Sequence, residues 1–199
     1  MRLEFLTFQI LCIEIGSFIS FLKNPIIFRI ENNDNKVYRL KTLISLLIFD
    51  FFLMLVLTCI LGVFRYLQLL PEISSDLVNG LMKENSIWWI IIALVIITPL
   101  FEEFIFRYFL KMEIAIKLPF WDKYFGYIYY LSASIFGLVH LFNFNRSDPS
   151  IYLYPLLISP QFFLGLFTGY LRVKFSLIWS IYFHSIHNAA FLFLSILLE

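Results

Sequence analysis

The amino-acid sequence predicts an all-α fold, a polytopic bundle of about seven transmembrane helices. Apolar residues make up 61% of the 199-residue chain and the mean hydropathy is +0.85, values far too high for a soluble domain of this size. Several apolar runs are also long enough to cross a bilayer, with short polar connections between them. We therefore expect residues 1–199 to form a single integral membrane domain.

Charge and cysteine content exclude two broad classes of function. The formal net charge of +1 leaves no basic surplus for binding nucleic acid. Cys12 and Cys59 each lie inside an apolar run, so neither a disulfide framework nor a cysteine metal site is expected.

Residues 1–70 are expected to contribute two N-terminal helices, 5–22 and 43–66. The first resembles a secretory signal, but it lacks a small-x-small cleavage site and Glu14 interrupts it, so we expect it to be retained. Glu14 and Asp50 lie within or at the edge of these helices, where carboxylates mostly pack against protein. The basic 23–41 connection is expected to be cytoplasmic.

Residues 87–118 form an apolar run that would be about 48 Å long as one helix, which exceeds a hydrocarbon core of about 30 Å. Pro99 lacks an amide hydrogen and disfavours helical geometry at Thr98. We therefore predict a short helix over 86–98, a break within two residues of Pro99, and a second helix beginning near 100.

Three further helices are predicted over 123–142, 151–171 and 175–197, which brings the total to seven. Gly165 and Gly169 have the small-residue spacing that favours close helix packing in lipid. If the chain breaks at Pro99, the end of the helix 123–142 and the middle of the last helix reach the depth of the residues that follow the break.

Three charged residues, Glu102, Glu103 and Arg107, lie in some of the most apolar sequence of the chain. Unpaired at mid-membrane, each ionised group would cost roughly 2.5 to 3.5 kcal/mol. Residues four apart share a helix face, so Glu103 and Arg107 can pair, whereas Glu102 points about 100° away. One carboxylate is thus expected to be tied to arginine and the other to be free.

These residues belong to an ordered set of short motifs. EEFIFR (Glu102, Glu103, Arg107) is followed by FGLVH, which ends at His140, and by HSIHN, which contains His184 and Asn188. Over roughly residues 86–193 the chain resembles the CAAX protease and bacteriocin-processing family (CPBP, also called Abi) of intramembrane peptidases, whose pattern is EExxxR, FxxxH and HxxxN or HxxxD. One departure is Tyr108, where the family usually has glycine.

The residue types suit peptide hydrolysis, which needs an activated water, a proton donor for the departing amine and donors to the oxyanion. Glu102 and His140 can supply the first two, and His184 and Asn188 lie four apart on one helix face, where both can donate to an oxyanion. The resemblance implies that Glu102 is the base and that Glu103 and Arg107 support it. Each residue alone also has a structural interpretation, and a structural one is preferred for His187.

A metal is possible at the same residues. Glu102, His140 and His184 would leave zinc, or another divalent ion, an open position for water. The family is commonly labelled metalloprotease, yet a metal-free glutamate mechanism fits the same residues, so both alternatives stay open.

The resemblance implies an intramembrane endopeptidase with a polar catalytic cavity in the bilayer and a membrane-anchored peptide or protein as its substrate. A non-catalytic bacteriocin-immunity or peptide-binding protein is the alternative, and a small transporter is disfavoured because no internal repeat is visible. The bias toward Phe, Ile, Asn and Lys is typical of a low-GC bacterium, so we expect a multi-pass protein of a bacterial plasma membrane. The oligomeric state is left open.

Overall fold

The computed structural model describes residues 2–27, 35–69, 87–112, 117–143 and 151–198, and within these ranges all regular secondary structure is helical. Five helices there are long and apolar enough to cross a membrane; their bounds are Lys36–Tyr66, Ile87–Lys111, Pro119–Phe142, Tyr154–Lys174 and Leu177–Ile196. The protein is therefore an integral, multi-pass membrane protein. The predicted total of seven spans is not reached among the described residues.

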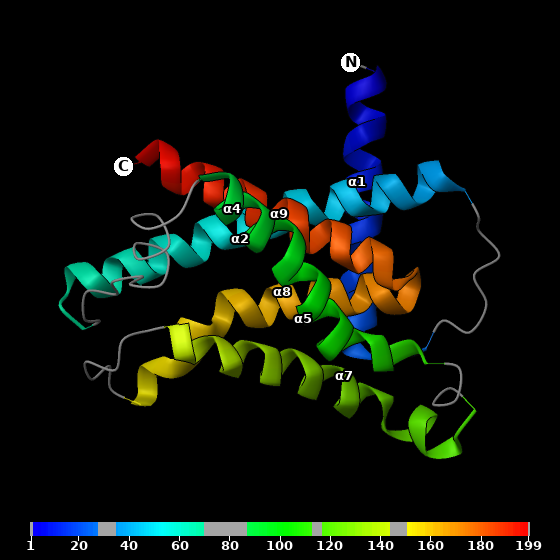
Figure 1. Cartoon of the computed structure of the whole chain (residues 1–199). Helices are drawn as coiled ribbons and strands as arrows, with labels where there is room; N and C mark the ends of the chain where they lie inside the picture. The colour runs from blue at the N-terminus through cyan, green and yellow to red at the C-terminus, as the bar shows by residue number, and fades with distance from the viewer. Residues whose placement is uncertain (1, 28–34, 70–86, 113–116, 144–150, 199) are drawn as a thin grey trace.

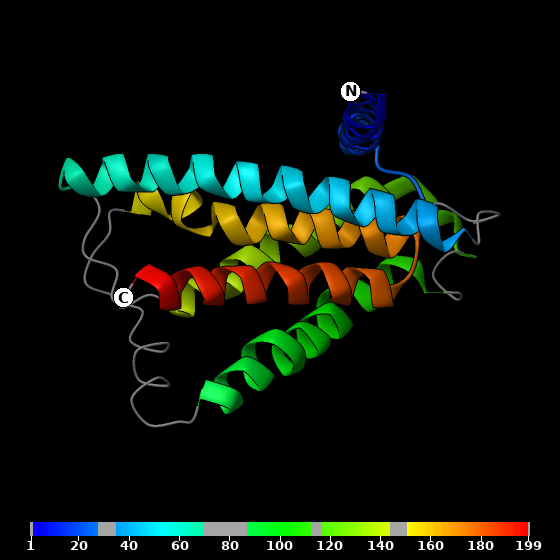
Figure 2. The same cartoon turned by 90° about the horizontal axis from the view of Figure 1, so that it is seen from above.

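Helix α8 (Tyr154–Lys174) is the centre of the bundle. It contacts α2 (Lys36–Tyr66), α7 (Pro119–Val139) and α9 (Leu177–Leu198), which run alongside it (Figures 1 and 2). Residues 164–171 are all buried, without the exposed stripe of a peripheral helix. The sequence from Gly165 to Gly169 therefore lies where helices approach most closely.

Helix α1 (Arg2–Lys23) lies across the other helices instead of running alongside them (Figures 1 and 2), and it is not one of the five candidate spans. Its Glu14 is buried, and Oε2 accepts a hydrogen bond of 2.9 Å from Thr42 on α2 and lies 3.1 Å from Nζ of Lys174 on α8. The carboxylate thus ties α1 to two other helices, in line with the packing role expected for it.

One continuous helix runs from Ile87 to Lys111, so the predicted break at Pro99 is wrong. Four segments follow one another in this helix: α4 (Ile87–Ile91), the π-helical η1 (Ile92–Ile97), α5 (Thr98–Arg107) and the 3₁₀ segment η2 (Tyr108–Lys111). The backbone of Ile97 and Thr98 stays helical, with φ/ψ of −69°/−52° and −58°/−53°. The helix type changes beside the proline, but the chain keeps its direction (Figure 2).

The π-helical turn explains how proline fits into this helix. It widens the helix just before Pro99, and the amide of Thr98 donates to the carbonyl of Ala93, five residues back. At the next position Pro99 has no amide hydrogen for the carbonyl of Leu94. Asn188 on α9 supplies the missing donor, because its Nδ2 lies 2.9 Å from that oxygen. A neighbouring helix therefore satisfies the group that proline leaves unpaired.

Gly165 permits the close approach of α8 to Arg107. A Cβ at this position would lie 2.9 Å from Nη2 of Arg107 and 3.1 Å from Cα of Ala133. We expect Gly165→Ala to displace the arginine and to cost about 1 to 3 kcal/mol of stability. Thermal unfolding of the purified protein in detergent measures this loss. Gly62→Ala is the control, because a Cβ there meets nothing within 4 Å; equal melting temperatures for both variants would contradict the prediction.

Helices α2 and α7 begin, and η2 and α8 end, at the same end of the bundle (Figure 1). The residues at or near these helix ends include the basic residues Lys36, Arg39, Lys41, Lys111, Lys117, Lys123, Arg172 and Lys174. We expect this end to face the cytoplasm. In a chain whose two natural cysteines are replaced by serine, an impermeant maleimide applied to intact cells should label Leu67→Cys, at the opposite end of α2, and spare Lys36→Cys. Labelling of the second variant alone would reverse the orientation.

Candidate active site

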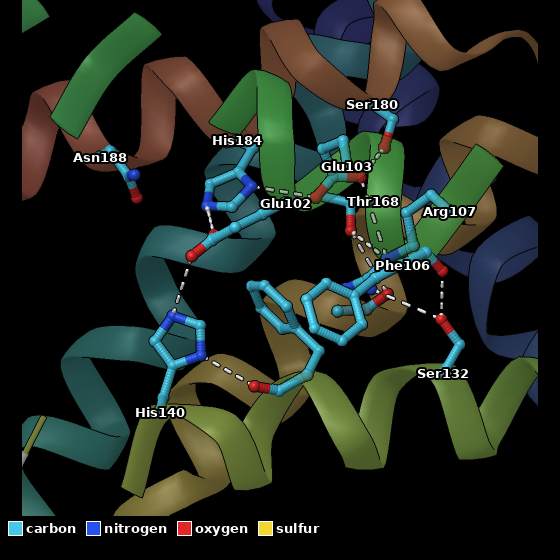
Figure 3. A network of polar contacts seen from close by, with 12 residues as sticks. Glu102, Glu103, Phe106, Arg107, Ser132, His140, Thr168, Ser180, His184 and Asn188 are labelled. Atoms are coloured by element: carbon cyan, nitrogen blue, oxygen red, sulfur yellow. Dashed lines mark hydrogen bonds and ion pairs between the residues drawn. The ribbon is translucent and has the colours of Figure 1, made fainter. Parts of the chain in front are cut away.

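Glu103 is fully buried at the centre of a polar network between α5 and α9 (Figure 3). Its Oε2 lies 3.8 Å from Nε of Arg107, one turn further along α5, as the four-residue spacing predicts. Ser180 donates a hydrogen bond to the same oxygen, and Nδ1 of His184 lies 2.9 Å from Oε1. Both oxygens of Glu103 are thus occupied by groups of the protein.

Arg107 is also fully buried and is held from several sides. Its Nε donates to Oγ1 of Thr168 at 3.1 Å and its Nη1 to Oγ of Ser132 at 3.4 Å. The guanidinium carbon lies 4.5 Å from the centre of the Phe136 ring, a cation–π contact. These contacts from α7 and α8 hold the guanidinium beside Glu103, whose charge it balances.

Glu102 has a different environment, one residue away on the same helix. Its side chain is 22% exposed, and its two oxygens face two imidazoles: Oε1 lies 3.6 Å from Nε2 of His140, and Oε2 lies 3.5 Å from Nε2 of His184. Among the described residues Oε2 is buried and accepts no hydrogen bond. Glu102 is therefore the carboxylate with capacity for a further partner.

Hydrogen bonds donated by Nδ1 fix both imidazoles with Nε2 toward Glu102. Nδ1 of His140 lies 2.8 Å from the carbonyl oxygen of Phe136, which can only accept, so this nitrogen carries a hydrogen. The same argument applies to Nδ1 of His184, because Glu103 beside Arg107 accepts there as a carboxylate. In the neutral imidazoles Nε2 is then the proton acceptor, and two such atoms flank one carboxylate.

Three separate helices bring these groups together without a break at Pro99. Glu102 lies on α5, His140 follows the end of α7, and His184 lies in the middle of α9. The predicted break at Pro99 is therefore not needed to bring the end of the helix 123–142 beside Glu102. The helix 87–111 is inclined to the rest of the bundle (Figure 2), and Glu102, in its second half, faces His140 with 3.6 Å between Oε1 and Nε2.

Comparison with models of known protein families identifies the family of this chain. The model of the family described as Type II CAAX prenyl endopeptidase Rce1-like matches residues 84–190, more than half of the chain. The chain belongs to this family. The predicted CAAX-protease resemblance is thereby confirmed, and α1 and α2 lie outside the match. No curated protein and no solved structure matched the chain.

Two further polar residues of α9 within the HSIHN stretch, Asn188 and His187, bind other partners. Asn188 lies one turn beyond His184 on α9, and its Nδ2 donates to Leu94 as described above. His187 does not join the Glu102 group but contacts Asp50 on α2, with 2.6 Å between Nδ1 and Oδ2. The family motifs thus supply both the Glu102 cluster and the contact that accommodates Pro99.

Sequence reasoning missed the hydroxyl groups that surround Glu103 and Arg107. Ser132, Thr168 and Ser180 are buried and bind these two side chains. Serine and threonine are too common in membrane helices to be informative singly. Of these three residues, only Ser180 could have been identified from its position in the sequence, because it lies one turn before His184 on the same helix face.

The site contains the donor types that zinc takes, namely two imidazole nitrogens and a carboxylate. In the part of the chain described here, however, no group of three or more His, Cys, Asp or Glu side chains is arranged to hold a metal ion. The two histidines face different oxygens of Glu102. We therefore derive no catalytic step through a metal.

Proposed function

We propose that this CAAX-family protease hydrolyses a peptide bond close to a membrane anchor, with water activated by Glu102 and His140. The observation that carries the proposal is the Glu102 carboxylate between two Nε2 atoms, at 3.6 and 3.5 Å, whose imidazoles are held by their opposite nitrogens. A general base needs a free lone pair and a neighbouring group that relays the proton. The proposal includes a polar cavity in the membrane that admits the substrate to Glu102.

In the proposed reaction the water oxygen bonds to the peptide carbonyl carbon while a water proton passes to Glu102. The carbonyl oxygen becomes an oxyanion. The proton then moves through Nε2 of His140 to the amide nitrogen as the carbon–nitrogen bond breaks, which releases the amine and restores the Glu102 carboxylate. General acid–base catalysis of this kind contributes typically about 10² to 10⁴ in rate.

The oxyanion is assigned to donors on α9. Asn188 has two amide hydrogens, and the bond to Leu94 uses one of them. We propose that the second hydrogen, together with Nε2 of His184 when it carries a proton, stabilises the oxyanion. Glu103 and Arg107 act through His184, because Glu103 holds its Nδ1.

We expect cleavage to continue after treatment with a chelator, because the proposed base and proton relay are side chains of the protein. The measurement is initial rate with and without the chelator, beside metal analysis of the same purified sample. A rate that falls with metal content and returns on addition of zinc would contradict the metal-free proposal and would restore Glu102, His140 and His184 as ligands.

A cleavage assay tests the proposed function. The purified protein is reconstituted in lipid vesicles with a peptide that ends in a CAAX sequence and carries a prenyl group on the cysteine. We expect release of a C-terminal fragment from this peptide and much slower release from the same peptide without the lipid. Cleavage of neither peptide would count against the proposal.

We also propose that the protein lies in a bacterial plasma membrane. The bias of the sequence toward Phe, Ile, Asn and Lys supports this assignment.

A further inference from the structure

A second buried contact between a histidine and a carboxylate lies next to the site. Nδ1 of His187 on α9 is 2.6 Å from Oδ2 of Asp50 on α2, and the two side chains are 8% and 0% exposed. The imidazole packs against Phe51 and Phe191, with ring centres 6.5 and 4.6 Å away. Asp50 lies outside residues 84–190, so the family match does not account for this contact.

The contact meets α9 on a different face from the site. Ser180, His184 and Asn188 succeed one another at four-residue spacing, and each hydrogen-bonds to the helix 87–111. His187 is about 60° round from His184 and about 100° from Asn188, so it faces α2 instead. Hydrogen bonds from one face of a helix fix its position along its own axis. A hydrogen bond from a second face also resists rotation of the helix about that axis.

Contacts with the helix 87–111 constrain the orientation of His184 only weakly, because little of that helix is buried. Only 17% of the most apolar part of this span is buried inside the protein, the lowest share of the five spans. Helix α2, like the helix 87–111, contacts both the central helix α8 and α9, and a larger share of its most apolar part, 28%, is buried. A bond from α9 to α2 therefore anchors His184 to the core of the bundle independently of the helix that carries Glu102.

We propose that Asp50 and His187 are positioning residues, which hold the rotation of α9 so that Nδ1 of His184 stays on Glu103 and its Nε2 faces Glu102. This inference rests on the proposed function, since it assigns His184 to the reaction. The pair touches no substrate in this proposal. Its effect is on kcat, because a misplacement of about 1 Å at a catalytic group can cost roughly 100-fold in rate.

The main test replaces the whole pair by apolar residues, Asp50→Leu with His187→Phe. Replacing both members of a buried pair commonly preserves stability, so the variant is expected to fold. We expect kcat to fall roughly 10- to 100-fold with KM within about twofold of the wild-type value. Asp50→Asn keeps an acceptor for Nδ1 of His187 and should retain most of kcat.

A matched control removes a buried ion pair elsewhere. Glu14→Leu with Lys174→Met replaces the contact between α1 and α8, where 3.1 Å separates the charged atoms. This variant should keep its kcat per folded molecule. The control shows whether the loss of any buried pair slows the enzyme.

Histidine NMR gives a readout that does not depend on activity. The chain has three histidines, so protein labelled with ¹⁵N-histidine gives few imidazole signals, and the His187→Phe variant identifies the signal of residue 187. We expect the His184 signals to shift in the pair variant and to stay in place in the control. This result tests the positioning even if the wild-type protein cleaves no peptide, in which case the proposed function alone fails.

Unchanged His184 signals would overturn the inference, whatever the value of kcat. A pair variant with wild-type kcat and KM would also overturn it, because the pair would then be purely structural. A lowered kcat with shifted His184 signals and an unchanged melting temperature is the result that supports it.

Discussion

Glu102→Gln is expected to abolish peptide hydrolysis while the protein stays folded. The amide has the shape of the carboxyl group but cannot take a proton from water, so we expect a loss of at least about 100-fold in kcat. Stability should change little, because the Glu102 side chain is 22% exposed and its nearest ionisable partners are imidazoles at 3.5 and 3.6 Å. The measurements are kcat per folded molecule and the melting temperature in detergent.

Glu14→Gln is the control for this variant, since it changes another glutamate that lies within a helix. Its carboxylate binds Thr42 and Lys174 away from the site, so kcat per folded molecule should persist even if stability falls. An active Glu102→Gln variant would remove Glu102 from the role of base. In cells, a phenotype that survives Glu102→Gln would favour the immunity or peptide-binding alternative over an enzyme.

Glu103→Gln is expected to act mainly on stability. It removes the negative partner of Arg107, which is completely buried, and such an unpaired charge typically costs about 3 to 5 kcal/mol. It also weakens the acceptor of Ser180 and of Nδ1 of His184. We expect low yield and a much lower melting temperature, measured by thermal unfolding beside expression level in the membrane fraction.

A double variant separates charge from shape at this position. Arg107→Met combined with Glu103→Gln removes both charges, so much of the lost melting temperature should return. A Glu103→Gln protein that is stable but inactive, beside an active Glu102→Gln, would reverse the assignment of base and support.

Local spacing alone predicted part of the site. Glu103 and Arg107 are one helical turn apart, so their pairing follows from helix geometry and from the cost of unpaired charge in lipid. The same geometry turns Glu102 away from the arginine, and the structure shows it facing His140 and His184 instead. The membrane class and the family motifs likewise needed no coordinates, because composition and residue order carry them.

Contacts between distant segments required the tertiary structure. Whether Pro99 breaks its helix depends on a donor from Asn188, 94 residues away from Leu94 in the chain, and no local rule gives that partner. The placement of the predicted span 5–22 also depends on such contacts: α1 is not among the candidate spans and lies across the bundle, where Glu14 ties it to α2 and α8.

The residues that carry charge within the membrane, and those of them that share a helix face, followed from the sequence alone, because helical spacing and the cost of burying charge act locally. Which nitrogen of each histidine faces Glu102 could be read only from the folded chain, since that depends on the acceptors at Phe136 and Glu103. It also decided that Asp50 meets His187, a contact between α2 and α9 that depends on how the helices pack.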